Sequence, residues 1–168
     1  MRRVGWMVLW GWLACAVAVA APADDHERGM QAYRRGDVVG AMGELRRAAD
    51  AGHLPSQTML AFILDRAGFV DESARLYQSA AERNDGEGHA GLAAALLTGR
   101  GLAKDEKRAW LHFSKAAELG HLPSIDLLAQ ALRTGQPGLP ADAAAAEQWR
   151  ARADALRKQA AASAPAAR

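Results

Sequence analysis

One segment of the chain occurs twice, and the spacing of its two copies restricts the folds that the chain can adopt. AADAGHLPSQTML starts at residue 48 and AAELGHLPSIDLL at residue 116, and eight of the thirteen positions are identical. Another alanine pair stands at residues 80 and 81, so the 68-residue spacing holds two repeats of 32 and 36 residues. Self-similarity at such a period is typical of solenoids, in which each repeat packs on its neighbours.

Each repeat is predicted to contain two helices. Apolar residues recur at helical spacing, and no stretch after residue 20 alternates in the way that a half-buried strand does. We therefore predict an all-α fold of about four stacked helical hairpins, an α/α solenoid. The predicted helices span 25–35, 37–50, 55–66, 70–83, 87–98, 104–119, 123–134 and 141–158.

Both helices of a hairpin carry a predicted packing seam. In the first helices of hairpins two to four, two leucines stand four positions apart, as Leu60 and Leu64 do, and therefore share one helix face. In the second helices a large residue stands between two small ones, which lets neighbouring helices approach closely. Arg150 breaks this rule in the last repeat, where a polar outer face is typical of a cap. The other positions are Leu92, Leu96, Leu128 and Leu132, then Ala41-Leu45-Ala48, Ser73-Tyr77-Ala80, Ala109-Phe113-Ala116 and Ala146-Arg150-Ala153.

The duplicated GHLPS motif falls where one hairpin is predicted to end and the next to begin. Gly52 and Gly120 can adopt the left-handed conformation that closes a helix C-terminus. Pro55 and Pro123 suit the first turn of the following helix, where no backbone donor is needed. The motif is therefore interpreted as a junction between hairpins rather than as a duplicated active site.

The N-terminus has the pattern of a secretory signal. Arg2 and Arg3 precede an apolar run that ends in Ala18-Val19-Ala20, an A-x-A cleavage site. We predict a cleaved signal peptide over 1–20, a single repeat domain over 21–158 and a disordered alanine-rich tail over 159–168. The expected location is periplasmic or secreted.

Two alternatives for the N-terminus stay open. Cys15 would serve a lipoprotein signal, although the bulky Trp12 stands three residues before it. An uncleaved anchor is the other, although spanning a membrane takes about 20 apolar residues and this run barely reaches that length. In the leading interpretation no membrane span is left after cleavage.

Composition excludes two classes of function. Cys15 is the only cysteine, so the chain after residue 20 has neither disulfides nor thiol chemistry. Of the 21 basic residues, two lie in the predicted signal, which leaves 19 against 19 acidic ones. A nucleic-acid partner needs a basic face, and this balance does not predict one.

The sequence predicts no catalytic, cofactor or metal site. None of the five histidines forms an H-x-x-x-H or H-E-x-x-H pair, although ligands from separate repeats could still meet in space. Two sets contain the residue types of a hydrolytic triad, but they straddle a helix end and a helix start, which favours a structural role. These sets are Ser56, His53 and Asp50, and Ser124, His121 and Glu118.

The two tryptophans that follow the predicted signal are expected to differ in burial. Trp149 stands at a packing position of the last repeat. Trp110 follows the packing Ala109 directly and is less obviously buried. An exposed tryptophan there would be a candidate contact point.

The third repeat, GHAGLAAALLTGRGLAKDEKRAWLHFSKAAELG at residues 88–120, resembles the Sel-one-like repeat (SLR) family, which is related to tetratricopeptide repeats. The resemblance is strong over 88–155 and weak over 25–83. It departs from the family pattern where Leu96 and Leu132 replace a tyrosine, and in lacking the cysteines of some secreted relatives. The matching positions are Gly88, Leu92, Ala93, Leu96, Gly99, Gly101, Leu102, Asp105, Arg108, Ala109, His112, Phe113, Ala116, Ala117 and Gly120.

The resemblance implies a right-handed superhelix whose first helices form a concave binding face. With the seam leucines inward, this face is apolar at its N-terminal end and polar at its C-terminal end, which would suit a protein or peptide with the complementary gradient. The predicted binding residues are Met30, Tyr33, Thr58, Phe62, Asp65, Leu97, Asp126, Gln130 and Arg133.

We expect a non-catalytic adaptor or scaffold in the cell envelope that binds a protein partner. One alternative is a periplasmic immunity or inhibitor protein directed at one hydrolase. The other is a hydrolase, as attributed to some cysteine-rich relatives; the missing cysteines and the structural explanation of GHLPS count against it. The sequence does not predict the oligomeric state.

Overall fold

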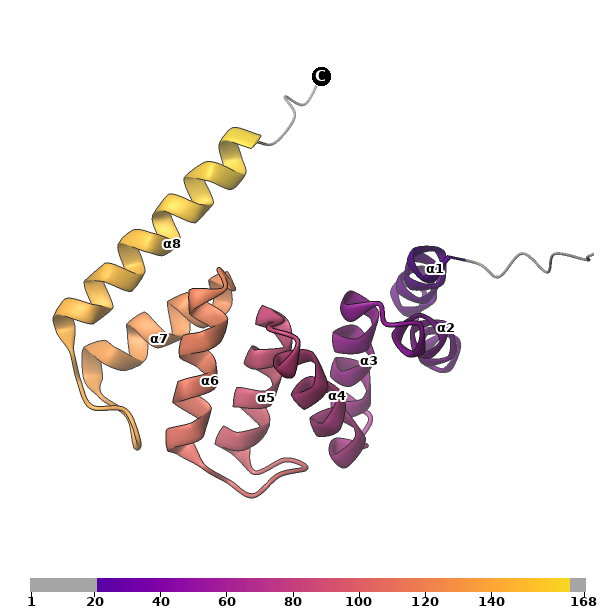
Figure 1. The fold of residues 1–168 in the computed structure, drawn as a ribbon, viewed down its shortest axis with the longest axis horizontal. Coiled ribbons are helices and arrows are strands. Elements are labelled where there is room, and N and C mark those ends of the chain that lie inside the picture. The colour runs from indigo at the N-terminus through magenta and orange to yellow at the C-terminus, as the bar shows by residue number, and fades with distance from the viewer. Residues whose placement is uncertain (1–20, 164–168) are drawn as a thin grey trace, which may run out of the picture.

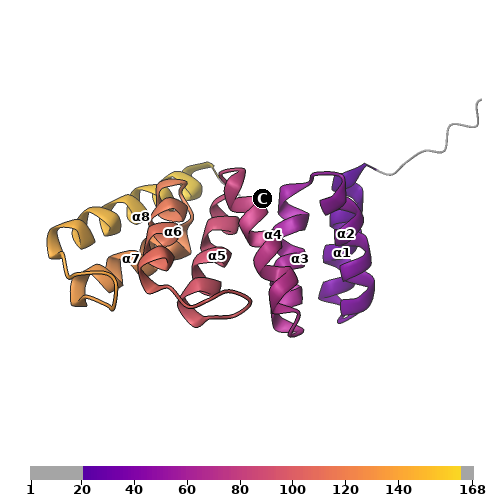
Figure 2. The ribbon, with the colours of Figure 1, turned by 60° about the horizontal axis from the view of Figure 1, so that its bottom comes forward.

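The structure is a computed structural model that describes residues 21–163. These residues form eight helices and no strand, as predicted, and the helices pack consecutively as a stack of hairpins (Figure 1). Figure 2, turned from that view, shows the pair α1–α2 beside the pair α3–α4. The helices are α1 (Pro22–Arg34), α2 (Val38–Asp50), α3 (Leu54–Arg66), α4 (Val70–Glu82), α5 (Gly86–Thr98), α6 (Glu106–Glu118), α7 (Leu122–Thr134) and α8 (Ala143–Ser163).

One predicted boundary is corrected. Helix α8 continues to Ser163, so residues 159–163 are helical and not part of a disordered tail. The alanines of this segment have high helix propensity, which explains the extension. Residues 1–20, where the signal peptide is predicted, and 164–168 lie outside the described part of the chain.

The predicted packing seam is confirmed. The paired leucines of α3, α5 and α7 are all buried, and so are the small and large seam residues of α2, α4 and α6. Because alanine or serine stands beside each large residue, the helix backbones approach closely and the array buries a continuous core.

The junction role of GHLPS is also confirmed. Gly52 and Gly120 have φ of +85° and +87°, a region that favours glycine. Pro55 and Pro123 lie in the first turns of α3 and α7. The N–H of His53 donates to the carbonyl of Ala48 at 3.0 Å, which satisfies the end of α2.

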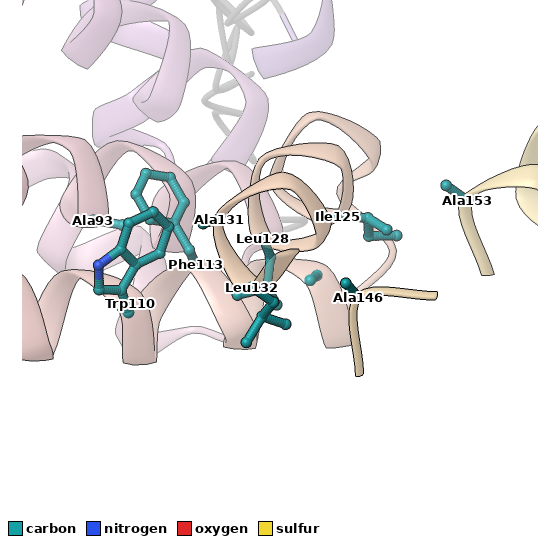
Figure 3. Packing of buried hydrophobic residues seen from close by; sticks show 10 residues of the cluster. Ala93, Trp110, Phe113, Ile125, Leu128, Ala131, Leu132, Ala146 and Ala153 are labelled. Carbon is teal, nitrogen blue, oxygen red and sulfur yellow. The ribbon is translucent and has the colours of Figure 1, made fainter. Parts of the chain in front are cut away.

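The last hairpin departs from the seam rule at Arg150, as predicted for a cap. Arg150 is exposed and pairs with Glu147. Ala146 and Ala153 provide the buried contacts (Figure 3).

Trp110, expected to be the less buried tryptophan, is buried, and its Nε1 donates to the carbonyl of Pro137 at 3.0 Å. Trp149 is only half-buried.

Candidate binding grooves

A groove of about 510 Å³ crosses the N-terminal ends of the first helices. Three hairpins contribute to it, through α1, α3 and the start of α5, so it depends on the stacking of the repeats and not on any single hairpin. We call it the N-terminal groove. Its lining residues are His26, Met30, Pro55, Thr58, Met59, Phe62, Asp85 and Glu87.

The centre of the N-terminal groove is apolar. Met30 of α1 and Met59 of α3 are half-buried, and the ring of Phe62 is 40% exposed. Methionine side chains adapt to differently shaped neighbours because they are unbranched and polarisable. An aromatic ring flanked by two thioethers can therefore accept bulky apolar side chains of more than one shape.

The α5 end of the N-terminal groove is acidic. Asp85 is the N-cap of α5, and its carboxylate accepts a hydrogen bond from the N–H of Gly88 at 2.7 Å. The Glu87 carboxylate accepts a hydrogen bond from His121 Nε2 at 3.0 Å, and this bond lowers the pKa of Glu87. Two carboxylates thus border an apolar surface.

Two further cavities continue over the first helices. A cavity of about 280 Å³ lies on the other side of Phe62, where Asp65 is paired with Arg100 at 2.9 Å. A cavity of about 440 Å³ lies between α5 and α7 and includes Leu97 and Gln130. Phe62 lines both the N-terminal groove and the cavity of about 280 Å³, which makes it the central apolar contact of this surface.

Some of the predicted binding residues line the three cavities, and others do not. Six of the nine line one of the three cavities, namely Met30, Thr58, Phe62, Asp65, Leu97 and Gln130. Thr58 contributes little polarity, because it is buried and its hydroxyl donates to the carbonyl of Leu54. Tyr33 packs on the core between α1 and α3, Asp126 pairs with Arg157 of α8, and Arg133 is exposed outside the three cavities.

Sequence reasoning missed the acidic end of the N-terminal groove. Asp85 occupies the N-cap position that His53 and His121 occupy in the neighbouring hairpins. This difference between the repeats is the sequence signal that could have indicated the acidic end, since a carboxylate replaces an imidazole at an equivalent site. Met59 was missed because it follows Thr58 directly and was not assigned to the same helix face.

The serine and histidine of each GHLPS motif are hydrogen-bonded, but with other partners than the predicted carboxylates. His121 Nδ1 lies 2.8 Å from Ser124 Oγ, and Glu87 rather than Glu118 contacts the far nitrogen of His121. At the first motif Ser56 Oγ contacts both His53 and His26 at 2.9 Å. Ser56 and Ser124 are both buried, and each hydroxyl is bonded to a histidine. These hydrogen bonds link neighbouring hairpins, since His26 contacts Ser56 and Glu87 contacts His121.

A second histidine contact joins the two helices of the third hairpin. The Nδ1 atoms of His89 and His112 are 3.0 Å apart, so one imidazole donates to the other. The ring centroids are 5.2 Å apart, and the two ring planes are tilted by 31°. Burial lowers the pKa of both imidazoles below the usual value of 6.5, and for His112 the charge of His89 adds to the effect.

We expect the fold to lose stability as the pH falls from 7.5 to 5.5. A histidine with a lowered folded-state pKa binds fewer protons than in the unfolded chain, so the stability present above pH 6.5 is lost as the pH falls through the folded-state pKa. The melting temperature should drop by about 4 °C, which corresponds to about 1 kcal/mol in a domain of this size.

Circular dichroism melts at both pH values would measure this shift. The double variant His89→Gln and His112→Gln keeps a hydrogen-bonding pair without its titration and should show a smaller drop, although not a flat profile, because the pKa of His26 is also lowered by burial and by His53. An unchanged or higher melting temperature at pH 5.5 would contradict this account.

Within residues 21–163, no helix is long and apolar enough to cross a membrane. The same part of the chain contains no group of three or more histidine, cysteine, aspartate or glutamate residues arranged to hold a metal ion.

The Sel1 repeat model matches the chain at residues 70–85, 86–121 and 124–153. The chain is also 34% identical over 146 residues to an uncharacterised protein of Neisseria meningitidis serogroup B. That match covers 83% of this chain and 31% of the relative, so the chain spans about a third of the relative's length.

Two solved structures share the fold. A Sel1 repeat protein from Oxalobacter formigenes superposes with a TM-score of 0.73 at 20% identity, over 79% of this chain and 56% of that one. A protective antigen of uropathogenic Escherichia coli that displays an SLR fold superposes with a TM-score of 0.64 at 23% identity, over 80% of this chain and 30% of that one.

Proposed function

The chain belongs to the Sel1 repeat family, whose helical solenoids generally mediate protein–protein interaction, and we propose that it is an exported, non-catalytic adaptor of the cell envelope. Its partner is a protein segment that lies across the first helices. Export rests on the signal-like residues 1–20, in which two arginines precede an apolar run and an A-x-A motif.

The observation that carries the proposal is the N-terminal groove. It is built from three successive first helices and is apolar at its centre. Phe62 is exposed there, although Leu60, Ile63 and Leu64 of the same helix are buried. Exposed aromatic rings in a concave apolar surface are typical of the residues that dominate binding energy at interfaces. A buried ring would serve the core, whereas this one faces the groove.

Phe62→Asp is expected to weaken partner binding by at least about tenfold. The change removes an aromatic contact and places a carboxylate in the apolar centre of the groove, and losses of about 2 kcal/mol are typical of such positions. The helical signal should be nearly unchanged, because Phe62 is not part of the buried seam. Binding would be measured by crosslinked affinity purification of the tagged chain from the periplasmic fraction, where recovery of the chain also tests export.

The matched control is Phe69→Asp. Phe69 is exposed at the N-cap of α4 and lines none of the three cavities described above, so the same substitution should leave partner recovery unchanged. A partner that is lost with Phe62→Asp and kept with Phe69→Asp supports the proposal. Equal recovery with both variants would place the binding surface elsewhere. Recovery of one hydrolase in a stoichiometric complex would instead favour an inhibitor.

A further inference from the structure

The composition of the N-terminal groove indicates what kind of segment it binds, if the proposed function holds. The groove combines an apolar centre with two carboxylates at one end, whereas the cavity beyond Phe62 has its carboxylate, Asp65, neutralised by Arg100. Among the three cavities over the first helices, the N-terminal groove thus joins a large apolar area to carboxylates that pair with no arginine or lysine of residues 21–163.

Both carboxylates are held in place by hydrogen bonds. Asp85 accepts the N–H of Gly88 as the N-cap of α5, and a helix N-terminus stabilises a negative charge. Glu87 accepts a hydrogen bond from His121, which lowers the pKa of the Glu87 carboxyl and keeps it ionised at neutral pH. The negative charge is therefore a fixed property of this end of the groove.

Within residues 21–163, His121 is the one ion-pair partner of these two carboxylates, at 3.0 Å from Glu87. Burial and the nearby His53 lower the pKa of His26, so its imidazole is neutral at pH 7. The Arg66 guanidinium lies one helical turn beyond Phe62 on α3, 5.7 Å from its ring centroid. Arg83 is bonded to the carbonyl of Gly52. A negative end and an apolar centre thus follow one another along the groove.

We propose that the N-terminal groove binds a protein segment in which bulky apolar side chains stand next to a lysine or arginine. The apolar side chains lie on Met30, Met59 and Phe62, and the basic side chain reaches Asp85 and Glu87. A volume of about 510 Å³ falls within the range of about 300–1,000 Å³ that is usual for binding pockets. Opposite charges at the rim select the partner and its orientation.

The test is a selection of random dodecapeptides displayed on phage, panned on the purified chain. Peptides recovered from the parent should be enriched in bulky apolar residues with an adjacent lysine or arginine. Panning on the double variant Asp85→Asn and Glu87→Gln should keep the apolar enrichment and lose the basic one. Asparagine caps a helix as well as aspartate does, and glutamine can still bond His121, so the fold is kept, as circular dichroism would verify.

The affinity of the most enriched peptide gives the quantitative outcome. Exchanging its basic residue for glutamate should weaken binding to the parent by at least about tenfold, and should change binding to the double variant by less than about threefold. Added salt should weaken the parent complex more than the variant complex.

The outcomes separate this inference from the proposed function. The charge preference is overturned if the peptides bind through Phe62 but show no basic enrichment. It is also overturned if the basic enrichment is equal on the double variant. In both cases the groove remains a binding site. Peptides whose binding is unaffected by Phe62→Asp, or a selection that enriches none, overturn both.

Discussion

Ala116→Glu is expected to abolish cooperative folding of the solenoid or to destabilise it by about 4 kcal/mol or more. Ala116 is completely buried in the seam between α6 and its neighbours, and its carbonyl accepts the N–H of His121 at the next junction. A glutamate side chain there either buries an unpaired charge or separates the helices, and both are strongly unfavourable. Such a loss is a large share of the about 5–15 kcal/mol that stabilises a typical domain.

Thermal and urea unfolding followed by circular dichroism would measure this effect. The matched control is Leu111→Glu, which introduces the same side chain on the same helix at a residue that is 59% exposed. It should change the free energy of unfolding by no more than about 0.5 kcal/mol, as surface substitutions usually do. If Ala116→Glu unfolds at the temperature of the parent, the register of α6 is wrong.

Gly88→Ala has the second largest expected effect, a loss of about 3 kcal/mol. Gly88 lies in the first turn of α5, where a Cβ would stand 2.5 Å from the Cβ of Ala80 and 2.7 Å from the backbone nitrogen of Ala81. Backbone atoms of α4 cannot move aside without opening the contact between the second and third hairpins. Overpacking of a close-packed interface usually costs about 1–3 kcal/mol, and here no flexible side chain can relieve it.

The same substitution at Gly43 should act in the opposite direction. Gly43 lies within α2, and a Cβ at this position would meet no atom within 4 Å. Alanine is favoured over glycine in a helix interior by about 1 kcal/mol, so Gly43→Ala should raise the stability. Chemical unfolding of both variants beside the parent checks the pair of predictions. A Gly88→Ala variant as stable as the parent would show that α4 and α5 are not in close contact.

The binding surface was predictable to the extent that it follows from helix periodicity. Once Leu60 and Leu64 are placed in the seam, the positions of Thr58 and Phe62 on the adjoining face follow from 3.6 residues per turn. Asp85 and Glu87 could not be found in that way, because they precede or begin α5 and reach the groove only through the stacking of the third hairpin on the second. Similarly, Asp126 was predicted to be available but is paired with Arg157 of α8.

The sequence by itself determined the number of hairpins, the position of each junction and the residues of the seam. These are local or periodic properties, since at two of the three junctions a glycine and then a proline end one helix and start the next, and residues four apart share a helix face. The tertiary structure decided which side chains of different repeats meet, as in Glu87 with His121, His89 with His112, and the residues of the N-terminal groove. Such contacts depend on the relative placement of whole helices, and no spacing along the chain encodes that placement.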